Sequence, residues 1–157
     1  YIPQRPREPA HWNLIKNVVE AVDCPVIANG DVECYEDFAR IRAQTGAASA
    51  MCARGAQWNL SIFRPEGMLP IDVVKKHFVQ RAIEYDNPWN FTKFQLREIL
   101  VHNKRMASDE GQCLNKCKTW DELAELYSLE DVLKESREKR RRAALRDDDE
   151  YTDTVHP

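Results

Sequence analysis

Two short turns carry the residues of this sequence that are best suited to holding an anion. One turn, Asn29-Gly30-Asp31, follows the apolar run "PVIA", and the other, Ala53-Arg54-Gly55, follows "AASAMC". A glycine lets main-chain N–H groups approach an anion because no Cβ stands in the way. A guanidinium pairs with phosphate through two parallel hydrogen bonds. Either turn alone is more typical of an ordinary surface turn. The two turns at consecutive strand ends predict a phosphate site, with two ordinary surface turns as the equally good alternative.

A helix is expected before the first turn, over residues 9–23, because apolar residues recur there at helical spacing. They are Trp12, Ile15, Val18, Val19 and Val22. The helix must end before Pro25, since the residue that precedes a proline avoids the helical conformation. The run "PVIANG" then predicts a short strand that is buried on both faces, as strands of parallel sheets are.

The same order of helix and strand precedes the second turn. Within "ECYEDFARIRAQTG", Phe38 and Ile41 share a helical face and Gly46 stands where a left-handed cap would end the helix. Residues 47–52 predict the next strand. Alternating helices and strands with short connections indicate a parallel sheet, either open or closed into a barrel. Two strands do not make such a sheet, so we expect its other strands upstream of Tyr1, in a protein of which this chain is a fragment.

From residue 67 onward the pattern is helical. One apolar stripe runs through Ile71, Val74, Phe78, Ala82 and Tyr85, a second through Phe91, Phe94 and Ile99, and Thr119 with Glu122 has the spacing of a capping box. We therefore predict an all-helical domain over residues 67–134. The tail over residues 135–157 is a basic block followed by an acidic one, and it is expected to be disordered. Its basic block is also compatible with a nuclear localisation signal or an RNA-binding arm.

Composition narrows the class of protein. The chain has 157 residues, of which 43% are hydrophobic and 31% are charged, with a net charge of -3. No apolar run is long enough for a membrane helix, and the net charge supplies no overall basic field for nucleic acid. The five cysteines are odd in number and scattered, which favours reduced thiols in the cytoplasm, with the nucleus as an alternative.

For three further groups of residues, a role in the structure is weighed against a role in a functional site. Cys113 and Cys117 stand four residues apart, but no second pair of Cys or His completes a zinc site, so no metal is predicted. Trp58 and its neighbours after the second turn are expected to pack the exit of the strand. Lys93 and Arg97, together with Lys104, share a helical face that would suit a phosphate backbone, although a merely solvated face explains them equally well.

The segments "PVIANGDV", "AMCARGAQWNLSIF" and "YDNPWNFTKFQLREIL" together resemble the C-terminal part of the tRNA-dihydrouridine synthases. The likeness covers residues 1–106 and is strongest to the eukaryotic branch that acts on the D-loop uridine at position 20. It implies a TIM (β/α)8 barrel that binds FMN, with its last strands and helices in residues 1–66. A helical tRNA-binding domain would follow over residues 67–134.

The resemblance also assigns roles to the two turns. It implies that Asn29, Gly30 and Asp31 hold the FMN phosphate from one side, and Ala53 and Arg54 from the other. Many members have Gly-Arg in the second turn. The Ala53-Arg54 pair of this chain keeps the main-chain amide, so the assignment stands.

The implied reaction is reduction of uridine to 5,6-dihydrouridine in tRNA, with NADPH as the hydride donor that reduces FMN. The catalytic cysteine of the family, and the lysine and histidine that contact the flavin, would lie upstream of Tyr1. We therefore assign no catalytic residue here and expect the fragment alone to be inactive without the missing half of its barrel. Two other hypotheses are a non-catalytic RNA-binding module derived from this family and an unrelated flavin or phosphate-binding barrel enzyme.

Overall fold

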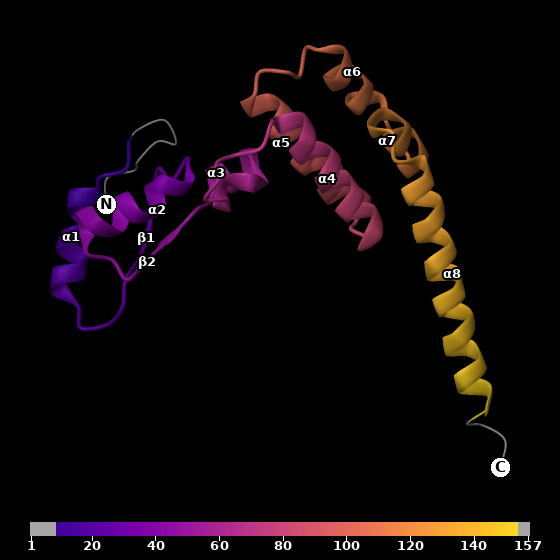
Figure 1. The fold of residues 1–157 in the computed structure, drawn as a ribbon, viewed down its shortest axis with the longest axis horizontal. Coiled ribbons are helices and arrows are strands. Elements are labelled where there is room, and N and C mark those ends of the chain that lie inside the picture. The colour runs from indigo at the N-terminus through magenta and orange to yellow at the C-terminus, as the bar shows by residue number, and fades with distance from the viewer. Residues whose placement is uncertain (1–8, 154–157) are drawn as a thin grey trace. The chain divides into compact units, whose positions relative to one another are not determined.

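The computed structural model describes residues 9–153, with side-chain surroundings for residues 9–145. The chain divides into two compact units, Tyr1–Val74 and Lys75–Pro157 (Figure 1). The first unit contains α1 (Trp12–Ala21), β1 (Ile27–Asn29), α2 (Tyr35–Thr45), β2 (Ser49–Met51), α3 (Arg54–Trp58) and the 3-10 helix η1 (Leu60–Phe63). The remaining helices are α4 (Ile71–Glu84), α5 (Trp89–His102), α6 (Asp109–Lys116), α7 (Trp120–Tyr127) and α8 (Glu130–Asp153).

The first unit has the predicted alternation of helices and strands. β1 and β2 are parallel, and Asn29 pairs with Met51 at their carboxyl ends. The core on one side of these strands is formed by Ala28, Val32, Ile41, Ala47 and Ile62. The expectation that the first strand is buried on both faces is wrong for this chain, because Ile27 is 63% exposed while Ala28 is 1% exposed. Only one face of the two-stranded sheet is covered by α1 and α2.

The apolar stripe of α1 is narrower than predicted. Trp12, Ile15 and Val19 pack against the core of the first unit, whereas Val18 and Val22 are exposed. At 100° per residue, the three packed positions fall within one narrow arc of the helix and Val18 lies further round it, whereas Val22 is the extended residue that follows α1. The second predicted helix, α2, ends as expected at Gly46, which has the left-handed φ of 74°.

Asp37 fixes the beginning of α2. Its Oδ2 accepts hydrogen bonds from the amides of Glu33 at 2.8 Å and Cys34 at 3.1 Å, and its side chain is buried. Burial raises the pKa of the Asp37 carboxyl, but these hydrogen bonds and the nearby Arg40 outweigh that effect and lower the pKa below its usual value. The folded state therefore favours the ionised carboxylate.

Replacing Asp37 with asparagine should therefore lower stability in a pH-dependent way. The lowered pKa means that the stabilisation is present above the unfolded-state pKa of about 4 and is lost as pH falls through the folded-state pKa. We expect Asp37→Asn to cost about 1 kcal/mol at pH 7, measured by urea unfolding, with a much smaller difference at pH 3. The exposed Asp23→Asn variant is the control, and an equal loss at both pH values would contradict the prediction.

The core of the second unit agrees only in part with the predicted stripes, of which Val74, Ala82 and Ile99 are buried. It is formed by Val79, Ile83, Leu96, Leu100, Leu114, Leu123, Ala124, Leu129 and Leu133. Tyr85, Phe91 and Phe94, which were expected on the buried faces, are 79%, 68% and 58% exposed. In α5 the aliphatic residues Leu96 and Leu100 take the core-facing side, and the helix has room for only one such side. The two phenylalanines consequently lie on its other side.

The boundary between the two compact units differs from the predicted domain limit. The predicted domain limit at residue 66 lies before the observed one, which follows Val74. The connecting segment stays with the first unit because Asn59 donates from its side-chain amide to the Leu69 carbonyl at 3.1 Å and Ser61 Oγ accepts from the Leu69 amide at 2.8 Å. The capping box of Thr119 with Glu122 is present at the start of α7.

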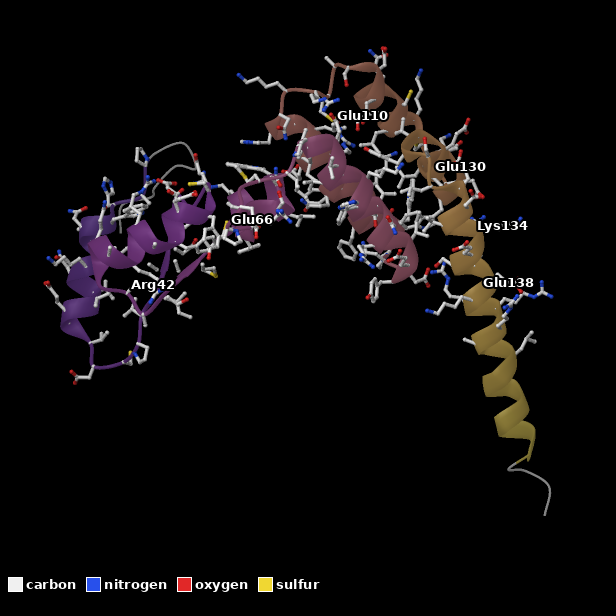
Figure 2. All side chains as sticks on the ribbon, in the orientation of Figure 1. Arg42, Glu66, Glu110, Glu130, Lys134 and Glu138 are labelled. Carbon is white, nitrogen blue, oxygen red and sulfur yellow. The ribbon has the colours of Figure 1, made fainter. Side chains whose placement is uncertain are left out.

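The segment from residue 135, expected to be disordered, is helical as far as Asp153, and residues 154–157 lie outside the described part. Figure 2 shows Glu130, Lys134 and Glu138 following one another along α8. As far as Arg140 the helix is held against α4 by hydrogen bonds. Ser136 Oγ and Arg140 Nη1 donate to the Ile83 carbonyl at 3.0 and 2.9 Å.

A buried charged cluster joins α4, α6 and α7. Lys75 is 1% exposed, and its Nζ lies 2.6 Å from both carboxylate oxygens of Glu110. Tyr127 donates to Glu110 Oε1 at 3.0 Å, and Arg105 Nη2 lies 3.3 Å from Oε2. Burial, followed by the nearby Glu110, raises the pKa of Tyr127 well above its usual value. Glu110, labelled in Figure 2, is therefore the shared acceptor of this cluster.

Candidate functional site

The two predicted turns meet in one cavity of about 140 Å³ at the carboxyl ends of β1 and β2. The cavity is lined by Asn29, Gly30, Asp31, Ala53 and Arg54, all predicted, and also by Trp58. The sheet register explains why they meet. The strands are parallel and end level with each other at Asn29 and Met51, so the chain leaves both strands toward the same side.

Arg54 is the cation of the cavity. It is the first residue of α3, and its Nη2 lies 3.1 Å from Asp31 Oδ1. Its guanidinium carbon lies 5.8 Å from the centre of the Trp58 ring. The side chain of Arg54 is 42% exposed. The guanidinium is therefore open to solvent while it is held between a carboxylate and an aromatic ring.

Asp31 has a second attachment that the sequence pattern did not indicate. Its Oδ2 accepts a hydrogen bond from the Ala10 amide, and its own φ of 53° lies in the left-handed region. Asp31 thus joins the segment before α1 to the turn after β1 and to α3. Glu33 also lines the cavity, so two acidic residues share this small space with one arginine. An anion held here would depend on main-chain amides as well as on Arg54.

Gly30 is required by the chain's own packing. Its φ of 145° is one that L side chains rarely adopt, and a Cβ at this position would meet Ala10 Cβ at 2.5 Å. Its carbonyl accepts a hydrogen bond of 3.1 Å from Trp12 Nε1. Gly55 is equally confined, since a Cβ there would meet the Val32 carbonyl oxygen. These close approaches are what allow the two turns to form a single small cavity.

Cys52 lies behind the cavity and is not poised as a nucleophile. Its Sγ donates to the Val32 carbonyl at 3.4 Å. Burial raises the pKa of this thiol above its usual value, although hydrogen bonds from the amides of Ala56 and Gly55 act in the opposite direction. Since the thiolate is the reactive form of cysteine, the raised pKa leaves Cys52 protonated at neutral pH. Its contacts connect the exit of β1 with the start of α3.

Lys93 lies beside Arg97 on α5, as hypothesised, but its ammonium group is engaged within the protein. Its ammonium group donates to the main-chain carbonyls of Asn115 at 3.0 Å and of Cys117, at the end of α6. A lysine at that position satisfies carbonyl groups that the helix itself leaves without partners. Arg97 and Lys104 are exposed. Lys104 follows the end of α5 at His102 and has a left-handed φ of 56°, so the predicted row of three cations does not form on the helix. Only Lys93 and Arg97 lie on α5, and Lys93 supports the fold.

No metal centre appears in the part of the chain whose side chains are described: residues 9–145 contain no group of three His, Cys, Asp or Glu side chains placed to hold an ion. Cys113 is exposed and Cys117 is buried. No helix within the described residues is both long and apolar enough to cross a bilayer.

Trp58 is one of the cavity-lining residues that sequence analysis missed, since it was interpreted as packing; Val32 and Glu33 are others. It lines the cavity together with the five predicted residues. Its position four residues after Arg54 is the signal that could have revealed this role. On a helix, side chains at positions i and i+4 are neighbours on one face, so any helix beginning at Arg54 would bring the Trp58 ring beside the guanidinium.

These features are those of an α/β protein with a polar ligand cavity just beyond the carboxyl ends of its parallel strands. The family profile described as "Dihydrouridine synthase (Dus)" matches residues 3–145. The chain belongs to the dihydrouridine synthase family, and the resemblance inferred from its motifs is confirmed.

Three relatives illustrate the range of the family. The chain is 30% identical over 131 residues to the NAD(P)+ tRNA-dihydrouridine(20) synthase of Schizosaccharomyces pombe, covering 82% of this chain and 27% of that protein. It is 32% identical over 132 residues to a tRNA-dihydrouridine(16) synthase of Cupriavidus necator, covering 78% and 37%. A tRNA-dihydrouridine(16/17) synthase-like protein of Mus musculus is 28% identical over 116 residues, covering 73% and 24%. The chain therefore spans only about a quarter to a third of the length of these relatives.

Proposed function

We propose that this chain is the C-terminal part of an FMN-dependent tRNA-dihydrouridine synthase that reduces a D-loop uridine with NAD(P)H. The observation that carries the proposal is the meeting of both strand-end turns and Arg54 in one cavity of about 140 Å³, in a chain that matches the Dus family over residues 3–145. The names of the similar proteins supply the substrate class, since each is a tRNA-dihydrouridine synthase.

The residues of the cavity fit the phosphate group of FMN. A glycine main chain at Gly30, the turn at Ala53 and the half-exposed guanidinium of Arg54 face one small space. Main-chain amides and a guanidinium are the donors that phosphate sites use. Asn29 completes the wall of the cavity with a side-chain amide. Bound FMN would supply the hydride that reduces the uracil ring, while these residues anchor its phosphate.

The remaining architecture is also proposed from this assignment. Residues 1–66 would supply the last strands and helices of a (β/α)8 barrel, and residues 67–134 a helical domain that contacts tRNA. The exposed apolar side chains of Ile27 and Met51 on the two-stranded sheet support the first part, because parallel strands are normally covered on both faces. The missing N-terminal half of the barrel would cover them and would carry the catalytic cysteine.

Arg54→Ala tests the phosphate assignment in the full-length protein. Hydrogen bonds to charged groups contribute about 1.5–3 kcal/mol, so the dissociation constant for FMN should rise at least tenfold. The measurement is FMN retention after gel filtration together with tRNA reduction by NADPH. Arg42→Ala removes an exposed arginine of α2 that does not line the cavity (Figure 2), and it should retain FMN and activity.

Three outcomes of this experiment separate the hypotheses. Loss of FMN in Arg54→Ala alone supports the proposed site. Full FMN occupancy in both variants removes Arg54 from the phosphate site. Wild-type protein that binds tRNA but neither binds flavin nor reduces tRNA would instead favour a non-catalytic RNA-binding module of the same family.

A further inference from the structure

Trp58 and Asp31 confine the Arg54 guanidinium from two directions. The Arg54 guanidinium carbon lies 5.8 Å from the Trp58 ring centre, and Arg54 Nη2 lies 3.1 Å from Asp31 Oδ1. All three side chains line the same cavity. The i, i+4 spacing of Arg54 and Trp58 on α3 makes the ring a fixed neighbour of the guanidinium.

The two neighbours of Arg54 have opposite effects on an incoming phosphate. Asp31 orients the guanidinium but places a negative charge beside it, which weakens the attraction for another anion. The Trp58 ring orients the guanidinium through a cation–π contact and carries no net charge. An arginine that is already oriented loses less conformational freedom when it binds. Trp58 thus preorganises Arg54 without the electrostatic cost that Asp31 brings.

We propose that Trp58 is a positioning residue that holds the Arg54 guanidinium in place for the phosphate group of the flavin cofactor. The proposal rests on the proposed function, because it requires that the cavity bind this phosphate. It assigns to Trp58 a role in cofactor recognition in addition to packing. Trp58 acts through Arg54 and itself needs no contact with the cofactor.

The test compares FMN with riboflavin, which is the same flavin without the phosphate. Dissociation constants of the full-length protein for both are measured by quenching of flavin fluorescence. Their ratio, riboflavin over FMN, isolates the contribution of the phosphate and cancels general damage to the fold. The variants are Trp58→Leu, Trp58→Phe and Arg54→Ala. Phe63→Leu is the control, since Phe63 is an exposed aromatic residue of the same unit that does not line the cavity.

The ratio should fall in proportion to the aromatic surface that is lost. Removing an exposed cation–π contact with Trp58→Leu should lower it about threefold to fivefold, and Trp58→Phe should lower it about twofold, because tryptophan is the best ring for such contacts. In an Arg54→Ala background, Trp58→Leu should have no further effect on the ratio. Phe63→Leu should leave the ratio unchanged.

The outcomes distinguish failure of this inference from failure of the proposed function. A high ratio that collapses in Arg54→Ala but stays unchanged in both Trp58 variants overturns the role of Trp58 and leaves the phosphate site in place. An effect of Trp58→Leu that persists in the Arg54→Ala background also overturns it. A wild-type ratio near one removes the phosphate site and this inference with it. If Trp58→Leu does not bind riboflavin, the milder Trp58→Phe variant decides.

Discussion

Glu110→Ala should destabilise the second unit by about 3–5 kcal/mol, which is the usual cost of removing one partner from a buried ion pair. Glu110 is the acceptor for Lys75 and Tyr127 and lies 3.3 Å from Arg105. Lys75 is 1% exposed, so its ammonium group would stay in the interior after it has lost the Glu110 carboxylate, whose oxygens lie 2.6 Å from Nζ. The loss should be visible as a lower midpoint in urea unfolding followed by circular dichroism.

A double variant separates the buried charge from the general effect of truncation. Replacing a whole buried pair with uncharged side chains is often neutral, because the desolvation penalty disappears with the charges. We therefore expect Lys75→Met combined with Glu110→Gln to be much more stable than Glu110→Ala alone. Glu66→Ala is the control, since Glu66 is 68% exposed and pairs only at the surface with Arg64. Equal losses in Glu110→Ala and in the double variant would contradict the argument.

The candidate cavity was largely predictable from sequence because its pieces are local. Each turn directly follows a strand, and parallel strands joined by a helix must end on the same side of a sheet. Knowing the order of elements was therefore enough to place Arg54 beside the turn at Gly30, and both line the observed cavity. The attachment of Asp31 to the Ala10 amide was not predictable, because the two residues are 21 positions apart. Ala10 also lies in the segment before α1, which has no periodic pattern.

The helical unit was less predictable because several helices compete for one core. Phe91 and Phe94 have helical spacing, but so do Leu96 and Leu100, and only the second pair is buried. Local spacing states which residues share a face and does not state which face meets the neighbouring helices. The role of Lys93 was hidden for the same reason, since the carbonyls it binds at Asn115 and Cys117 belong to another helix.

Gly30→Ala should also lower the free energy of unfolding by a large amount, because it introduces both backbone strain and a steric clash at this residue. The φ of 145° is strained for any L side chain and costs about 1–3 kcal/mol. The new Cβ would also meet Ala10 Cβ at 2.5 Å, and overpacking of this kind typically costs about 1–3 kcal/mol. We expect a combined loss of roughly 2–6 kcal/mol in the free energy of unfolding.

Two control variants divide this loss into its parts. Gly67 also has a positive φ, of 97°, but nothing lies within 4 Å of a Cβ built there, so Gly67→Ala should show only the strain of the backbone. Combining Gly30→Ala with Ala10→Gly removes the steric contact and leaves the strain, and it should recover about 1–3 kcal/mol. Urea unfolding of the four proteins measures both terms. If Ala10→Gly recovers nothing, the close approach of the segment before α1 to the turn after β1 is not what requires a glycine at position 30.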